Sequence, residues 1–266
     1  MRNTLLAVAV ATTLFALPAG AETLSGNNIN LVGSASMQNA ELQLTGNSQN
    51  QAGAAWLASP LSTSRSFSVT YDFSLANPGK DNMADGVAFV LQNKGPNAIG
   101  DGSAGSYIGY YGLNGVGSVV QTWYNDTTGL NIDGNPSSSK KAPTLLGAAH
   151  RVTGNETVSY DAASHQLSMT GTLNVDGQLF PVSDSASIDL AAKFGPSMYL
   201  GFTGATGAAF ADQRITRFSV TVVPEPKPAA TEVPEQKSYT WLIFGLVLLA
   251  VLGLLLIILR RKGKKA

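Results

Sequence analysis

The residues in this sequence that could do chemistry are an acidic residue followed by glycine and a glycine-rich run far downstream. Asp85 lies in the run Ala84-Asp85-Gly86-Val87-Ala88-Phe89, and about 115 residues later the sequence reads Gly201-Phe202-Thr203-Gly204-Ala205-Thr206-Gly207. A carboxylate accepts hydrogen bonds, and glycines let backbone N–H groups approach a ligand closely. Asp-Gly alone is also a common turn. The two runs indicate a hydrogen-bonding site if the fold brings them together.

The sequence carries no arrangement typical of a hydrolase. A glycosidase needs two carboxylates about 5–10 Å apart, which on a strand appear at even spacing. Between residues 22 and 222 the glutamates are Glu22, Glu41 and Glu156, and none is paired in that way. Gly-x-Ser-x-Gly, His-Glu-x-x-His and cysteine are all absent from the sequence. We predict a non-catalytic protein and keep a glycoside hydrolase as the less favoured alternative.

The N-terminal residues are typical of a secretory signal. Arg2, an apolar run over residues 5–16 and the triplet Ala19-Gly20-Ala21 fit a signal peptide that spans residues 1–21. Export and the lack of cysteine together mean that the mature domain is stabilised without disulfides. We expect that domain to span residues 22–222.

The C-terminal residues are typical of a membrane anchor. Residues 223–238 contain four prolines and favour an extended linker. Residues 241–259 carry no charge over 19 positions, which as a helix would extend about 28 Å, close to the thickness of a bilayer core. We predict a transmembrane helix at 239–259 and a basic cytoplasmic tail at 260–266, because positive charge stays on the cytoplasmic side. The domain would then be extracellular or periplasmic.

The charge of the exported part argues against nucleic acid as a partner. Residues 22–240 hold 11 Lys and Arg against 17 Asp and Glu, a net charge of −6. Binding to nucleic acid calls for a basic stripe instead. The membrane, through the predicted helix, is the first partner that we expect.

Short alternating segments between turn residues predict an all-β fold. Residues 66–73, 157–160, 166–170 and 215–222 alternate between apolar and polar side chains, whereas 87–91 and 197–202 are more uniformly apolar. Many strands with few helices favour a sandwich of antiparallel sheets. We find neither an internal repeat nor a second domain in the sequence.

Several of these segments, in order along the chain, resemble the bacterial legume-type (L-type) lectins. They are Gly33-Ser34-Ala35, Glu41–Thr45, Gln51–Trp56, Ala84–Gln92, Gly105–Tyr110, Ser118–Asn125 and Met198–Gly207. The resemblance covers nearly all of the predicted domain and implies a concanavalin A-like jelly-roll sandwich that binds glycans. Pro224-Glu225-Pro226 with the apolar helix and basic end also resembles a PEP-CTERM sorting tail, although its gap to the helix is longer, so we favour a plain membrane anchor.

The resemblance also assigns candidate sugar-binding residues. Asp85 matches the family's Asp, which follows a cis peptide bond and accepts hydrogen bonds from two sugar hydroxyls. Ser106 matches a glycine whose backbone N–H contacts the sugar, and Tyr107 beside it either stacks on the sugar or covers the sheet edge. Ala208 and Ala209 match the last sugar loop, which contributes backbone N–H groups. Asn125 matches the family's site asparagine.

The metal loop of the family is altered in this chain. Family members carry Glu-x-Asp, an Asn four residues later, and a further Asp, which together hold a calcium and a transition-metal ion. Here Val119 and Gln121 replace the two acidic residues, Asn125 is retained, and Asp126 and Asp133 are candidates for the last position. Calcium prefers six to eight oxygen ligands, including carboxylates. We therefore expect weak or no calcium binding at Asn125 and Asp133, and no transition metal.

Two functions follow from this comparison. The favoured one is a cell-surface carbohydrate-binding protein that acts in adhesion or in recognition of envelope glycans. The alternative is a lectin fold that has lost metal-dependent sugar binding and serves as a structural or protein-interaction module. The sequence does not define the sugar or the oligomeric state.

Overall fold

The structure is a computed structural model that describes residues 22–24, 28–77, 79, 82–101, 105, 107–123, 126–223, 246, 248–249 and 251–254. The chain divides into two compact units, Met1–Pro224 and Glu225–Ala266. The first unit contains all the candidate site residues that the structure describes.

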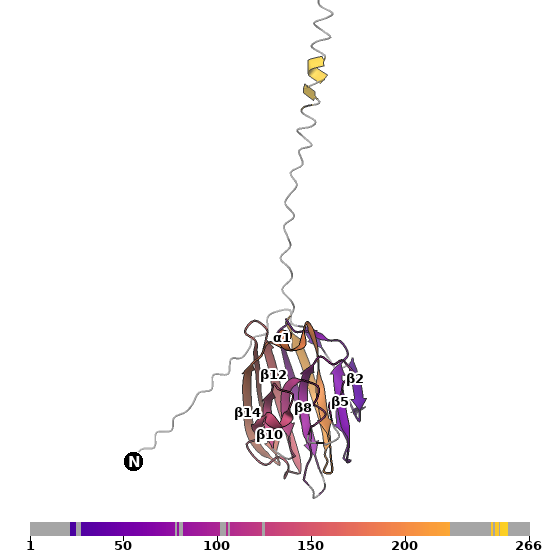
Figure 1. The fold of residues 1–266 in the computed structure, drawn as a ribbon, viewed down its shortest axis with the longest axis vertical. Coiled ribbons are helices and arrows are strands. Elements are labelled where there is room, and N and C mark those ends of the chain that lie inside the picture. Colours follow the sequence, from indigo (N-terminus) through magenta and orange to yellow (C-terminus); the bar gives the residue numbers. More distant parts are fainter. Residues whose placement is uncertain are drawn as a thin grey trace, which may run out of the picture. The chain divides into compact units, whose positions relative to one another are not determined.

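Within the described residues, the first unit consists of two antiparallel sheets of eight strands each (Figure 1). Sheet A has the order β14-β13-β12-β7-β16-β4-β3, with β1 also paired to β16. Its strands are β1 (Glu22–Leu24), β3 (Ser36–Gln38), β4 (Glu41–Thr45), β7 (Phe67–Ala76), β12 (Arg151–Asp161), β13 (Gln166–Val175), β14 (Gln178–Ser187) and β16 (Asp212–Val222). The predicted sandwich of antiparallel sheets is confirmed.

Sheet B has the order β11-β10-β9-β8-β15-β5-β2, with β6 also paired to β15. Its strands are β2 (Ile29–Gly33), β5 (Ala52–Leu57), β6 (Leu61–Ser62), β8 (Gly86–Gln92), β9 (Val116–Gln121), β10 (Thr127–Asn131), β11 (Lys140–Lys141) and β15 (Ser197–Ala205). Two short helices, η1 (Pro136–Ser138) and α1 (Leu190–Phe194), complete the described elements of this unit.

The alternating pattern of the sequence explains how sheet A faces both core and water. In β7 the side chains of Phe67, Val69 and Tyr71 are buried, while the intervening polar residues lie on the outer face. On that outer face hydroxyls pair across the strands, and the oxygens of Thr70 and Thr157 lie 3.0 Å apart. A period of two thus sets which face of the sheet is buried.

Sheet B is buried on both faces, which explains the uniformly apolar β8. One face contributes to the main core, where Tyr71 of sheet A meets Phe89 and Phe202 of sheet B with ring centroids 6.0 and 5.1 Å away. The other face carries a second cluster that includes Val90, and the loop residue Ile108 covers it. This cover places Ile108, Tyr110 and Leu113 against β8, whose first residue directly follows Asp85.

The second unit is described only over part of its length. Residues 246, 248–249 and 251–254 are helical, and the side chains of Leu246 and Leu254 are exposed. No helix in the described part of the chain is both long and apolar enough to cross a bilayer. The expected signal at 1–21, the expected linker at 223–238 except Val223, the expected tail at 260–266 and most of the expected helix at 239–259 lie outside the described residues.

Candidate functional site

Three segments that are distant in sequence meet at Asp85, the residue just before β8. The Asp85 N–H donates to the Ala205 carbonyl at the end of β15 over 3.1 Å, and its carbonyl accepts from the Thr122 N–H after β9 over 2.8 Å. A Cβ added to Gly105 would lie 2.2 Å from Asp85 Oδ2 and 2.5 Å from the Gly207 nitrogen. The two runs singled out in the sequence are therefore neighbours, with Gly105 packed between them.

The Asp85 carboxylate is buried and only partly satisfied. The residue is 2% exposed, and its Oδ2 has no hydrogen-bond partner among the described residues. Burial raises the pKa of Asp85 to about 7, although a hydrogen bond from the Gly207 backbone opposes the shift. Since a buried polar atom without a partner is costly, Oδ2 is an acceptor suited to a ligand hydroxyl. The peptide bond between Ala84 and Asp85 is cis, as the family resemblance implies.

The second loop is fixed by its backbone. The Thr206 N–H donates to the Gln51 carbonyl over 2.8 Å, and the Asn50 N–H donates to the Gly207 carbonyl over 3.1 Å. The Gln49 side chain donates to the Ala208 carbonyl over 2.7 Å. Ala208 is exposed, so this loop is positioned by its carbonyls while the methyl side chain remains accessible. Ala209 follows and is half-buried.

Tyr107 lies two residues after Gly105 and is half-buried. Its ring stacks on Tyr111 with the centroids 4.5 Å apart and an interplanar angle of 21°. Tyr111 is 42% exposed, so the pair presents an aromatic surface on the loop that follows Gly105. The structure supplies Tyr107 with a stacking partner from its own loop.

Sequence reasoning did not assign a role to Trp123. This residue is half-buried and directly follows Thr122, whose N–H holds the Asp85 carbonyl. An indole at that place can contact the apolar face of a ligand whose hydroxyls reach Asp85. The signal in the sequence is an aromatic residue two positions after β9, within the segment that the family resemblance assigns to the metal loop.

Two predicted site residues, Ser106 and Asn125, lie outside the described residues. Their roles stay predictions. The described neighbours Gly105 and Tyr107 bracket Ser106, and Trp123 and Asp126 lie on either side of Asn125 in the sequence.

The described residues of the metal loop do not fit the calcium and the transition-metal ion that the family resemblance implies. Val119 is fully buried and packs in the second apolar cluster. Gln121 is also fully buried, and its Oε1 accepts from the Thr127 hydroxyl over 3.1 Å. Asp126 Oδ1 accepts from the backbone N–H groups of Leu146 and Gly147 over 2.8 and 2.9 Å. Within the described ranges, no group of three or more His, Cys, Asp or Glu side chains could hold a metal ion.

Asp133, the other predicted metal residue, lies in the turn after β10 and is exposed. Its carboxylate accepts from the Asn135 N–H over 2.8 Å, from the Asn131 amide over 3.0 Å and from the Ser138 hydroxyl. Partial burial would raise the pKa of Asp133, but these hydrogen bonds outweigh it and hold the pKa below its usual range. These hydrogen bonds hold the Asp133 carboxylate within its own turn.

Comparison with known proteins gives a family and a common fold. The legume lectin domain family matches residues 21–237. A seed lectin of Styphnolobium japonicum is 30% identical over 153 residues, which cover 53% of this chain and 51% of that lectin. The aligned part thus spans about half the length of that curated relative.

Solved structures agree on the fold. A Bauhinia forficata lectin in complex with GalNAc superposes with a TM-score of 0.64 at 23% identity, over 76% of this chain and 98% of that chain. Arcelin-5, a lectin-like defense protein from Phaseolus vulgaris, superposes with a TM-score of 0.62 at 16% identity, over 77% and 99% of the two chains. These likenesses show that the sandwich has the concanavalin A-like fold.

Proposed function

This chain belongs to the legume lectin family, and we propose that it binds carbohydrate at the loops around Asp85. The observation that carries the proposal is the unpartnered Oδ2 of Asp85, which is buried where the first site loop meets Gly105 and Gly207. A sugar hydroxyl is a donor of the kind that this oxygen lacks. The glycan is the chemical partner that this arrangement suits.

The surrounding groups supply the other contacts that a sugar needs. The backbone N–H groups of Ala208 and Ala209 lie in the loop pinned to Gln51, and the half-buried Trp123 follows Thr122, whose N–H holds the Asp85 carbonyl. A sugar ring has hydroxyls at its edge and C–H groups on its faces, so a carboxylate beside an aromatic ring matches both. Because the Bauhinia forficata lectin was solved with GalNAc, galactose-type glycans are the first to test.

We propose that binding occurs without turnover. The known relatives are lectins, and the buried Glu156 hydrogen-bonds to the hydroxyls of Tyr71 and Ser118 inside the sandwich. The pKa of Asp85 is shifted by burial and by the Gly207 backbone, and not by a second carboxylate with which it could share acid–base work. Release of reducing sugar from a bound glycan would contradict this part of the proposal.

We also propose that calcium binds weakly or not at all, and that no transition-metal ion binds. Support comes from the apolar and amide side chains of Val119 and Gln121 at the family's acidic positions. Without those two carboxylates the loop lacks anionic oxygens of the kind that calcium prefers. Metal titration followed by calorimetry would detect a tight site if one exists.

Display on a cell surface is a further part of the proposal. The uncharged residues 241–259, the basic residues that follow and the exposed leucines of residues 246–254 support insertion in a membrane. Many copies on one membrane would raise the avidity of a weak single site, which suits adhesion or envelope recognition. Fractionation of cells that express the full chain, compared with a chain ending at residue 238, tests the anchor.

The central experiment is a glycan-array screen of the full-length chain with calcium and with chelator, alongside Asp85→Asn. We expect glycan binding that the substitution weakens severely, because an amide nitrogen replaces one of the two carboxylate acceptors. Asp72→Asn is the matched control, since Asp72 pairs with Arg217 on the outer face of sheet A and its loss should leave binding intact. If the wild-type chain binds no glycan in any condition, the carbohydrate proposal is wrong and the protein-interaction alternative takes its place.

A further inference from the structure

Gln213 of β16 is a polar side chain that reaches from sheet A to the back of the candidate site. It is fully buried, and its amide nitrogen donates to the Ala84 carbonyl over 3.1 Å and to the Ala205 carbonyl over 2.8 Å. Ala84 precedes Asp85, and Ala205 ends the strand that leads to Gly207. One side-chain amide therefore links the two loops that form the site.

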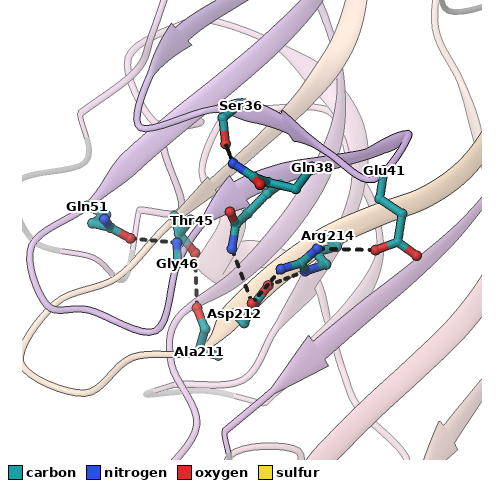
Figure 2. A network of polar contacts seen from close by, with 10 residues as sticks. Ser36, Gln38, Glu41, Thr45, Gly46, Gln51, Ala211, Asp212 and Arg214 are labelled. Atoms are coloured by element: carbon teal, nitrogen blue, oxygen red, sulfur yellow. Dashed lines mark hydrogen bonds and ion pairs between the residues drawn. The ribbon is translucent and has the colours of Figure 1, made fainter.

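The backbone of β16 is held in place on the other face of the sheet. Figure 2 shows Arg214 donating to both carboxylate oxygens of Asp212, at 2.6 and 2.9 Å, and to Glu41 of β4 at 3.3 Å. The Gln43 amide also donates to Asp212, over 3.1 Å. The pairing of β16 with β4 shifts register between Gln213 and its successor. This outer network fixes the two residues that flank Gln213, so the amide enters the interior at a defined place.

A second support reaches the same loop from the metal-loop side. The Asp126 carboxylate holds the N–H groups of Leu146 and Gly147, and the Gly147 carbonyl in turn accepts from the Met83 N–H over 2.8 Å. The Thr122 hydroxyl donates to the Met83 carbonyl over 3.1 Å. Both polar backbone groups of Met83, two residues before Asp85, are therefore paired within the protein.

We propose that Gln213, supported by Asp126, positions the two loops of the carbohydrate site in place of the metal ions that the family's acidic residues bind. This inference rests on the proposed carbohydrate function, which supplies the ligand. Its statement about metal ions rests on the side chains that stand at the family's metal-binding positions. Val119 and Gln121 stand at the acidic positions with their side chains committed to packing and to Thr127. Gln213 and Asp126 are positioning residues, because they act on the loops through hydrogen bonds to backbone groups.

The test uses the full-length chain and Gln213→Met, which keeps the side-chain volume and removes the amide donor. Hydrogen exchange of peptides that cover residues 82–87 and 203–209 should become faster in the variant. In the wild type, the same exchange should be unchanged by chelator or by added calcium and manganese. Affinity for the best glycan of the array should fall about tenfold, the equivalent of one lost hydrogen bond.

Gln92→Met is the matched control. Gln92 is also fully buried and hydrogen-bonded to backbone, but at the far end of β8, about 20 Å from Asp85 at the rise of a strand. It should lower the melting temperature as Gln213→Met does and leave glycan affinity unchanged. A merely structural role for Gln213 would give the two variants the same affinity, and that result would overturn the proposal.

The absence of a supporting metal ion is tested separately by hydrogen exchange. Slower exchange of the site peptides on adding calcium or manganese, or faster exchange with chelator, would show that an ion still supports the loops and would overturn the proposal. These readouts need no glycan. If the wild type binds no sugar but exchange responds to Gln213→Met and not to chelator, the carbohydrate function fails while the positioning role stands.

Discussion

Glycan affinity should depend on pH through Asp85, because a protonated carboxyl loses acceptor strength toward a sugar hydroxyl. Burial raises the pKa of Asp85 to about 7 in the free protein. At pH 6 about one molecule in eleven, and at pH 5 about one in a hundred, would carry the ionised group. If only that form binds, the apparent Kd rises about tenfold for each pH unit below 7 and is flat above 8.

The stability of the free protein should respond to the same group in the opposite sense. Because the folded pKa of Asp85 lies above its unfolded value, the group stabilises the fold at low pH, and that contribution is lost as pH rises through about 7. Sugar that binds the ionised form should therefore raise the melting temperature more at pH 8 than at pH 5.

The assay is calorimetric titration of the full-length chain with its glycan between pH 5 and 9, in two buffers of different ionisation enthalpy. Proton release on binding should appear near pH 6 and vanish above pH 8. Asp85→Asn, which cannot titrate, should bind weakly and without pH dependence. A wild-type Kd that is constant from pH 5 to 8, or an equal slope in Asp85→Asn, would refute the reasoning.

Three further substitutions test the site and its support. Gly105→Ala should weaken glycan binding at least tenfold, because the new Cβ would lie 2.2 Å from Asp85 Oδ2 at a backbone φ of 57°. Weaker binding on the array together with an unchanged melting temperature would distinguish this local effect from unfolding. Trp123→Ala should cost roughly tenfold in affinity if its ring contacts the sugar, as titration would measure; unchanged affinity would exclude that contact. Burial raises the pKa of the Glu156 carboxyl, so the wild-type protein loses the stabilising contribution of this group as pH rises. Glu156→Gln cannot titrate, and its stability relative to wild type should therefore increase with pH. Thermal unfolding at pH 5 and pH 8 checks it, and an equal difference at both values would contradict it.

Strand positions followed closely from the sequence because burial imposes a period of two. The segment 66–73 alternates and became β7, and 215–222 became the end of β16. The start of β16 was missed because Asp212, Gln213 and Arg214 are polar, and only the tertiary structure shows that one points inward and two outward.

The candidate site was predictable from the sequence where it rests on a motif, and not where it rests on contacts between distant residues. Asp85 was identified from its run, and the structure brings it to Gly207 as expected. Gln213 carries no local signal, since a glutamine between two charged residues resembles an exposed strand. Asp126 was considered for a metal, whereas its carboxylate binds backbone N–H groups of a loop some twenty residues later. Such partners depend on loop conformation, which spacing does not encode.

The loop at residues 206–208 is anchored by its backbone and by the Thr206 hydroxyl, while the Ala208 side chain is exposed. Its carbonyls and N–H groups are bound by residues 48–51, whereas the Ala208 side chain contributes nothing to that anchoring. On the proposed carbohydrate function, substitutions at Ala208 and Ala209 should therefore alter ligand preference at little cost to folding. A small library randomised at these two positions should then yield variants that differ in sugar preference on one unchanged scaffold.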